Sequence, residues 1–271
     1  MSKRLRTPDL LSWVVAALMA VQSTLGLIFS DQYHDVAWIR STWFGNDWVT
    51  LVLAVPLLGF ALMRARRESV TGLLLWLGML GYAAYNYAYY MLGAALNVFF
   101  PLYIATLVSS AVALILVLAR SEEAEIAGSF RSTTPVRLVG GYLVFTAVGL
   151  ASVWLLTWAG YAFAGRPTPI EPEAFKLVAA LDLSLMVTAM GFGGVLLWQR
   201  NAWGYVLASI AAIQGALYLL VLTVNSLVSI SRGLSDAPGE TPLWGTLAVL
   251  TTAAALALLG GLRRGARVPA E

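Results

Sequence analysis

The chain has 271 residues, of which 59% are hydrophobic and 11% charged, with a formal net charge of +3. Soluble domains carry roughly 25% charged residues, so this composition excludes an ordinary soluble domain and indicates an integral membrane protein. The absence of cysteine excludes thiolate metal sites, iron–sulfur clusters and disulfides, and a lone histidine, His34, excludes paired-histidine metal motifs. We therefore expect no metal site and no cofactor, and nucleic acid is not expected as a partner because no soluble segment could carry a basic face.

Eight segments are long and apolar enough to cross a bilayer, which requires about 20 predominantly apolar residues in a helix. The sequence thus predicts an all-α integral membrane bundle of eight transmembrane helices. In chain order these are Leu10–Ser30, Trp48–Met63, Ser69–Leu92, Val98–Ala119, Leu138–Ala164, Leu177–Trp198, Trp203–Ser226 and Leu243–Leu262. The second is the shortest and could begin earlier than Trp48. The first run is longer than the 7–15 residue core of a signal peptide, so we expect it to be retained.

Basic residues alternate between the two sides of the predicted bundle. One side, which includes both chain ends, holds 13 of the 17: Lys3, Arg4, Arg6, Arg64, Arg66, Arg67, Arg120, Arg131, Arg137, Arg200, Arg263, Arg264 and Arg267. The other side holds Arg40, Arg166, Lys176 and Arg232. Because cytoplasmic loops carry the excess of Lys and Arg, both termini are predicted to be cytoplasmic, in a multi-pass protein of the bacterial inner (plasma) membrane.

The longest cytoplasmic loop divides the chain into two halves of four helices. Residues 1–119 form the first half, 120–136 a cytoplasmic linker and 137–271 the second half. Setting Asp47 against Asp182 aligns the halves as parallel repeats related by an axis along the membrane normal. With three residues of extra loop, the later pairs are Gly72 with Gly204, Tyr82 with Gln214 and Asn86 with Tyr218. Identities are few, and coincidental spacing is the alternative.

Two features of the linker suggest local structure. Ser121 could cap a short surface helix whose first turn is acidic, and Thr134-Pro135 has the pattern of a new helix start, with Thr as the cap. On the outer side, Asp31–Trp48 carries several aromatic rings and is interpreted as a segment lying in the headgroup zone. A cap over a cavity is the alternative for this segment, and Ser229–Pro242, which contains Pro238, is expected to be an exposed loop.

Asp182 is the one charged residue predicted inside a span away from its end. An acid at that depth must be hydrated, protonated or paired, and by default it marks a functional site. The alternative is that its helix begins late and Asp182 merely caps it. Asp47, at the edge of its span, is interpreted as interfacial.

Polar and aromatic side chains form stripes on the third and seventh spans. Residues three, four and seven apart share one helical face. The ligand-binding candidates are Asp182 together with Tyr82, Tyr85, Asn86, Tyr89, Gln214, Tyr218 and Asn225. These side chains could line a cavity that opens outwards, with Asp182 at its mouth, or they could simply hydrogen-bond helices together. Pro56 should kink the second span, and Gly191, Gly193 and Gly194 should allow bending or close packing in the sixth.

A stretch between the sixth and seventh spans, Leu196-Leu197-Trp198-Gln199-Arg200-Asn201-Ala202-Trp203-Gly204-Tyr205-Val206-Leu207-Ala208, resembles a hairpin found in uncharacterised bacterial polytopic membrane proteins. The resemblance covers this hairpin alone and implies no function. Physically, Trp198 and Trp203 flank a short basic turn and would anchor it at the headgroups.

Three functional hypotheses follow. The leading one is a protein that binds, and could transport, a small or amphipathic molecule, with Asp182 as the cation or proton site. The second is a non-transporting assembly subunit or sensor that contacts a protein partner or another copy of itself, with the small residues Ala253, Ala254, Ala257 and Gly261 facing lipid. The third is a lipid-modifying enzyme using Asp182 with Asp35 or His34. No nucleotide-binding, hydrolase or metalloprotease motif occurs, so we assign no catalytic residue and favour a non-enzymatic role.

Overall fold

A computed structural model describes residues 5–234, 239–263 and 265–266, and throughout this part of the chain the regular structure is helical. Lys3, Arg4, Arg264 and Arg267, which contribute to the predicted orientation, and Pro238 of the predicted loop lie outside the described residues.

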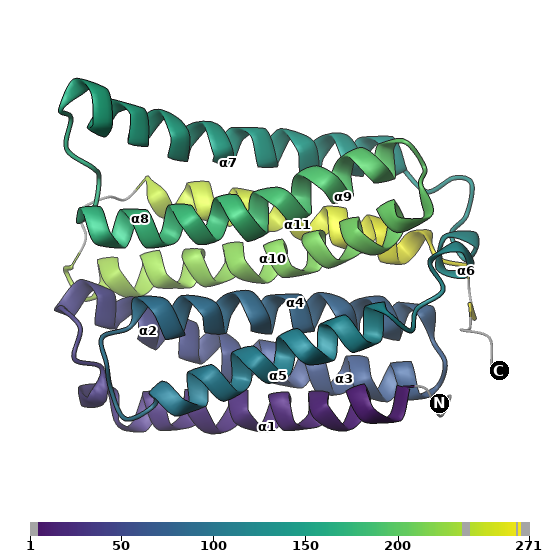
Figure 1. Cartoon of the computed structure of the whole chain (residues 1–271), viewed down its shortest axis with the longest axis horizontal. Helices are drawn as coiled ribbons and strands as arrows, with labels where there is room; N and C mark the ends of the chain where they lie inside the picture. Colours follow the sequence, from purple (N-terminus) through teal and green to yellow (C-terminus); the bar gives the residue numbers. More distant parts are fainter. Residues whose placement is uncertain (1–4, 235–238, 264, 267–271) are drawn as a thin grey trace.

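The helices follow the predicted spans closely and extend several of them (Figure 1). Their bounds are α1 Arg6–Ile28, α2 Ala37–Val49, α3 Val55–Arg66, α4 Val70–Gly93, α5 Phe100–Leu118, α6 Glu123–Gly128, α7 Val136–Ala164, α8 Pro172–Leu181, α9 Thr188–Trp198, α10 Ala202–Ser231 and α11 Glu240–Gly261. Two pairs run on without a break through π-helical segments, α2 into α3 through Thr50–Ala54 and α8 into α9 through Asp182–Val187.

Seven helices in the described part of the chain are long and apolar enough to cross a membrane. This confirms the prediction of a helical, multi-pass membrane bundle. The third predicted span, α4, is not among the seven, although it has 24 residues. Its tyrosines and Asn86 make it less apolar, and 17 of its residues are buried by other helices. A helix shielded from lipid in this way does not require an apolar surface.

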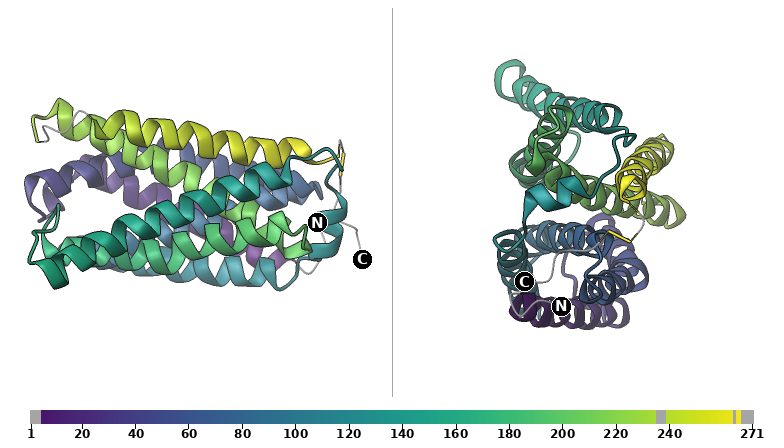
Figure 2. Two further views of the ribbon diagram at one scale, coloured as in Figure 1. Left: turned by 90° about the horizontal axis from the view of Figure 1, so that it is seen from above. Right: turned by 90° about the vertical axis from the view of Figure 1, so that its right-hand side faces the viewer.

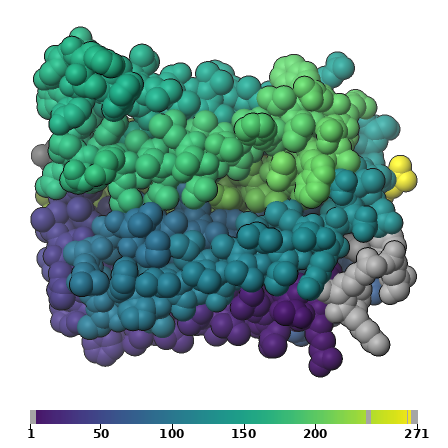
Figure 3. Space-filling model, viewed as in Figure 1, coloured from purple at the N-terminus to yellow at the C-terminus, as the bar shows by residue number. Residues whose placement is uncertain are grey.

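The long helices run roughly side by side along one axis (Figures 1 and 2). The first described turn of α1, the short helix α6 and the last turn of α11 lie together at one end, called here the linker end. Backbone bonds from Arg131 to Gly261 (2.9 Å) and from Arg263 to Ser129 (2.9 Å) connect the linker to α11 there. Side chains fill the face formed by α5, α8 and α9 (Figure 3).

Two buried helices join the halves of the bundle. The central helix α4 packs against α3 and α5, and α10 packs in the same way against α9 and α11. They also pack against each other, and each reaches across to the other half, α10 to α2 and α4 to α8. The outer pairs differ, because α1 packs along α5 whereas α7 packs mainly along α9 and touches α11 over a short stretch.

The second helix of each half contains its π-helical segment near the middle. In the first half this segment lies just before Pro56, which has no N–H to donate to the preceding turn. The backbone N–H of Val55 instead bonds to the carbonyl of Thr50, five residues earlier. A π-helical segment thus precedes Pro56, and the kink expected there stays a prediction. Such segments are frequent at functional sites.

The turns that follow these helices match one another in detail. Glu68 (φ 60°) and Arg200 (φ 57°) both adopt left-handed backbone conformations, and the next residue caps the following helix in both halves: Ser69 accepts from the N–H of Gly72, and Asn201 from that of Trp203. A Cβ on Gly72 would lie 2.4 Å from the nitrogen of Ala65, and one on Gly204 would lie 2.3 Å from the carbonyl carbon of Leu196. Glycine lets each hairpin close because its backbone can approach its neighbour directly.

Several local expectations are wrong. The short linker helix begins at Glu123 without a side-chain cap, since Ser121 bonds to Val117 instead, and α7 begins at Val136 with Thr134 bonded to Arg131 and Gly261.

Two further expectations on the later helices need correction. Of the small residues on α11 expected to face lipid, Ala254 and Gly261 are buried. The loop expected from Ser229 is shorter, because α10 continues to Ser231 and α11 begins at Glu240. Gly193 and Gly194 do allow close packing, against Ala208 and Gly140, whereas Gly191 has only an ordinary contact.

Candidate functional site

Both aspartates of the proposed repeat lie deep in their helices. Asp47 is ten residues beyond Ala37, and Asp182 is ten residues beyond Pro172. At 1.5 Å per residue each acid lies about 15 Å along its helix. Their exposed fractions are 0% and 1%. The helix of Asp182 thus begins earlier than predicted, and the acid does not cap it.

The carboxylate of Asp47 is surrounded by neutral donors. Tyr90 of α4 donates to Oδ1 (2.7 Å) and Tyr33 donates to Oδ2 (2.7 Å), while Gln22 of α1 donates both to Oδ1 (3.2 Å) and to the Tyr33 oxygen (3.0 Å). Tyr87 orients this amide by donating to its oxygen (2.8 Å). Three bonds to one carboxylate replace the hydration that the acid loses on burial.

Asp47 is therefore buried between helices and lies within a continuous helix, whereas the sequence placed it at the edge of a span. The segment around it, expected in the headgroup zone, forms the first turns of α2, and Trp43 within it is buried against the rings of Tyr90 and Tyr89. The polar residues between Asp31 and Trp48 interrupt the apolar sequence, so the predicted span begins only at Trp48. Asp47 therefore lies at the edge of that span in the sequence-based prediction.

The Asp182 carboxylate also has neutral donors, and they come from both halves. Tyr85 of α4 donates to Oδ1, and Trp154 of α7 donates to Oδ2 (2.9 Å). Tyr218 of α10 packs edge-on against Tyr85, with ring centroids 5.0 Å apart, and its hydroxyl also faces Asp182. Asp182 thus lies where α4, α7 and α10 converge. By contrast, the buried Asp9 at the linker end forms an ion pair with Arg66 (2.7 Å).

A third polar group lies where α2, α4 and α10 meet. Asn46 donates to Asn86 (2.9 Å), and Asn225 of α10 packs directly against Gly45, where a Cβ would lie 2.3 Å from Asn225 Oδ1. Each of these three buried amides leaves one polar atom without a protein partner: Asn46 Oδ1, Asn86 Nδ2 and Asn225 Oδ1. A buried polar atom without a protein partner is costly, and these three residues are called here the asparagine cluster.

The structure brings only some of the predicted site residues together. Tyr85 and Tyr218 gather at Asp182, whereas Asn86 and Asn225 belong to the asparagine cluster. The other three lie elsewhere along α4 and α10: Tyr82 pairs with Thr50 (3.3 Å), Gln214 contacts Gly81, and Tyr89 packs on Trp43. All eight are buried except Tyr89 and Tyr218, which are half-buried. The outward-opening cavity stays a prediction.

Sequence reasoning missed Gln22, Tyr33, Asn46, Tyr90 and Trp154. Tyr90 lies near the end of α4, and the others stand singly outside the polar stripes, Tyr33 in the connection between α1 and α2. The alignment of Asp47 with Asp182 could have pointed to these residues, because a second buried carboxylate would need its own set of hydrogen-bond donors.

The outer-loop pair of the enzyme hypothesis has structural partners. Asp35 accepts from the Trp43 indole (2.9 Å) and from the backbone N–H of Ala95 (3.0 Å), and His34 interacts with the carbonyl of Leu96 (3.2 Å). These bonds tie the start of α2 to the loop between α4 and α5. They assign Asp35 a structural role and leave the enzyme hypothesis without support from this geometry.

The chain matches no family model, no curated protein and no solved structure in comparisons with known proteins. The argument for function therefore rests on the residues and their geometry.

Proposed function

We propose that the chain is an inner-membrane protein of eight spans, with both termini in the cytoplasm, that binds a small amphipathic cation at Asp182 and moves it across the membrane. The observation that carries the proposal is a buried carboxylate whose described partners are all neutral, at the contact between the two halves. A negative charge at this depth attracts a cation or a proton because no Lys or Arg among those partners compensates it.

The proposed parallel repeat is supported by matched features in the two halves. These are the two aspartates at equal depth, the π-helical segments beside them, the left-handed turns and the glycines at the hairpins. Counting α4 as a span gives each half four helices. Binding sites at midplane between repeats, beside irregular helices, are common in transporters.

Asp182 lies near the less tightly packed side of the second half. On α7 every buried residue lies between Val136 and Ala147, so the rest of the helix contributes no buried residue. Near the linker end, Tyr142 bonds to Thr251 of α11 (2.5 Å). Trp154, the donor to Asp182, belongs to the loosely packed part of α7. An outward movement of this part would separate Trp154 from Asp182 and admit a ligand from the lipid.

The proposal is tested with tetraphenylphosphonium as the amphipathic cation and protein reconstituted in nanodiscs. We expect saturable binding by equilibrium dialysis, lost in Asp182→Asn and retained in Asp47→Asn, which removes the equivalent charge from the other half. Uptake of the same cation into proteoliposomes should follow the same pattern. Size-exclusion profiles and circular dichroism establish that both variants fold. Equal binding by wild type and Asp182→Asn, or no saturable binding at all, would reject the proposal.

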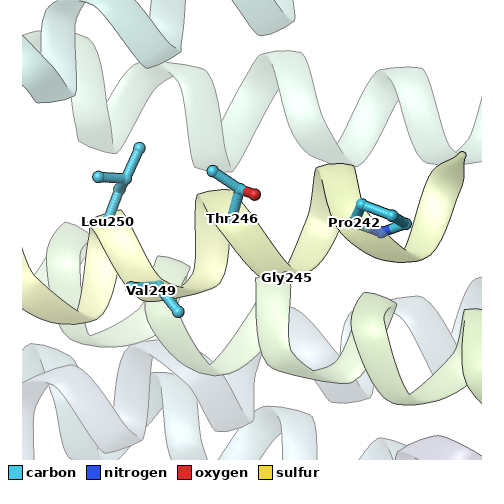
Figure 4. A pocket seen from close by; sticks show the side chains of 5 residues that line it. All are labelled: Pro242, Gly245, Thr246, Val249 and Leu250. Carbon is cyan, nitrogen blue, oxygen red and sulfur yellow. The ribbon is translucent and has the colours of Figure 1, made fainter.

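A groove on α11 favours a second candidate function, a non-transporting assembly subunit. Small and medium side chains three and four residues apart line this groove, which lies along one side of the helix (Figure 4): Pro242, Gly245, Thr246, Val249 and Leu250. Small residues at such spacing allow another membrane helix to approach closely. If assembly is the function, Gly245→Leu should lower the mass of the particle measured by native mass spectrometry, whereas tetraphenylphosphonium should not bind.

A further inference from the structure

We propose that Asp47 is a proton-binding site, connected to the end of the bundle opposite the linker by the hydroxyl groups of Tyr33 and Tyr103. It is a second site, distinct from the cation site proposed at Asp182, and its assignment does not depend on that function.

The surroundings of Asp47 suit a proton better than a larger ligand. Bonds from Tyr33, Tyr90 and Gln22 already occupy both carboxylate oxygens. At Gly26 of α1, a Cβ would lie 2.2 Å from Asp47 Oδ2 and 2.4 Å from the Tyr33 hydroxyl, so the helix backbone closes this side of the carboxylate. A proton can be added here without displacing any side chain, whereas an organic cation cannot.

All groups facing Asp47 are uncharged when their hydroxyls are protonated. Among the described residues they are Gln22 and Ser23 from α1, Tyr33 from the connection between α1 and α2, and Tyr82, Tyr87 and Tyr90 from α4; beyond Tyr33 lies Tyr103 from α5, with the carboxylate of Asp35 near it. No cation is among them, so neutralising the buried charge requires an incoming positive charge. Burial, together with the charge of Asp47, raises the pKa of the Tyr33 hydroxyl, which keeps it protonated and able to donate.

A row of hydroxyl groups leads from Asp47 toward the loop between α4 and α5. The Tyr33 hydroxyl donates to Asp47 (2.7 Å) and lies near Tyr103, whose own hydroxyl donates to Asn97 Oδ1 (3.3 Å). Asn97 belongs to the loop between α4 and α5, where the neighbouring Leu96 is 75% exposed. Asn97 (8% exposed) and Tyr103 (1%) are buried beneath this loop, so the path starts below the surface and ends on the buried acid.

Proton transfer along the path conserves charge at every tyrosine. The O–H bond of Tyr33 breaks as a new O–H bond forms on Asp47 Oδ2. Tyr33 takes a proton from Tyr103, whose hydroxyl turns from Asn97 toward Tyr33, and Tyr103 takes one from a hydronium ion that arrives at the loop and is left as water. The carboxylate becomes a carboxylic acid, and both tyrosines are neutral before and after.

Infrared difference spectroscopy on the purified full-length protein in nanodiscs tests this site. In sodium-free buffer, acid-minus-alkaline spectra should contain a carbonyl band of a protonated carboxylic acid. Asp47→Asn should remove this band, and Asp182→Asn should leave it. A spectrum that Asp47→Asn does not change, or an Asp47 band that is constant over the whole pH range, would overturn the proposal. So would loss of the band on adding sodium at constant acidic pH, which would identify a metal cation as the ligand.

Two conservative variants, both of which keep the Asp47 carboxylate, distinguish the role of the hydroxyl path from that of the groups bonded to Asp47. Tyr103→Phe removes a hydroxyl of the path that is not bonded to Asp47, so the band should keep its frequency while its hydrogen–deuterium exchange slows. Tyr90→Phe removes a bond to Asp47 outside the path, so the band should shift in frequency with exchange unchanged. Identical effects of the two variants would contradict the path. None of these measurements requires cation binding at Asp182, so this proposal and the proposed function can fail separately.

Discussion

At Gly26, the missing side chain leaves room for the carboxylate of Asp47. A methyl group at this position would overlap both the carboxylate and the Tyr33 hydroxyl, and neither group has space to withdraw, because both are buried. The position of the buried acid therefore depends on a glycine of a neighbouring helix as well as on the donors around it.

Substituting Gly26→Ala tests this dependence. We expect a loss of about 1–3 kcal/mol in the free energy of unfolding, the usual range for overpacking a buried site. Thermal or detergent-induced unfolding of the purified protein measures it. Gly149→Ala is the matched control, since a Cβ there meets nothing within 4 Å. It should leave stability unchanged or raise it slightly, because alanine favours helix. Equal stability of the two variants would contradict the contact at Gly26.

At the scale of elements, the two helical hairpins of α3–α4 and α9–α10 are closed by the same device. In both, a residue with a left-handed backbone precedes the cap, and a glycine in the next turn touches the backbone of the preceding helix. Different side chains build equivalent turns in the two halves, Ser69 in one and Asn201 in the other.

The equivalence of the hairpins predicts equal effects of equivalent substitutions. Gly72→Ala and Gly204→Ala should each lower the free energy of unfolding by about 1–3 kcal/mol, since each added methyl group meets backbone that cannot rotate away. Gly260→Ala on α11, where a Cβ has no neighbour within 4 Å, should be neutral. Detergent-induced unfolding compares the three. A large loss in one hairpin alone would argue against a shared construction.

At the scale of the whole molecule, the arrangement of the polar groups depends on α4, which is enclosed by other helices of the bundle. This helix supplies Tyr85 to Asp182, Asn86 to the asparagine cluster and Tyr90 to Asp47, so it links the three polar groups of the bundle. Because it is buried on most sides, it can carry these side chains at membrane depth without exposing them to lipid. Whether α4 crosses the membrane also determines whether the two proposed halves run parallel.

Single cysteines test that crossing directly, because the natural chain has none. We expect a membrane-impermeant maleimide to label Leu96→Cys in intact spheroplasts and to label Glu68→Cys only after permeabilisation, since α4 separates these two positions. Glu122→Cys in the linker should behave like Glu68→Cys. Labelling of positions 68 and 96 from the same side would exclude α4 as a span and the parallel repeat with it.

The sequence alone determined the helical membrane bundle and the places of its long helices, because length and hydrophobicity decide what can cross a bilayer. It singled out Asp182 but left open whether this acid caps its helix or lies within it. It also provided the pairing of Asp47 with Asp182. Only the tertiary structure decided that Asp47 is buried. The start of α2 is too polar to be recognised as part of a span, and Trp43 and Asp47 become buried through their contacts with α4. The sorting of the polar stripes into separate clusters likewise depends on how α2, α4, α7 and α10 converge. Contacts between distant segments leave no periodic signal in a single sequence.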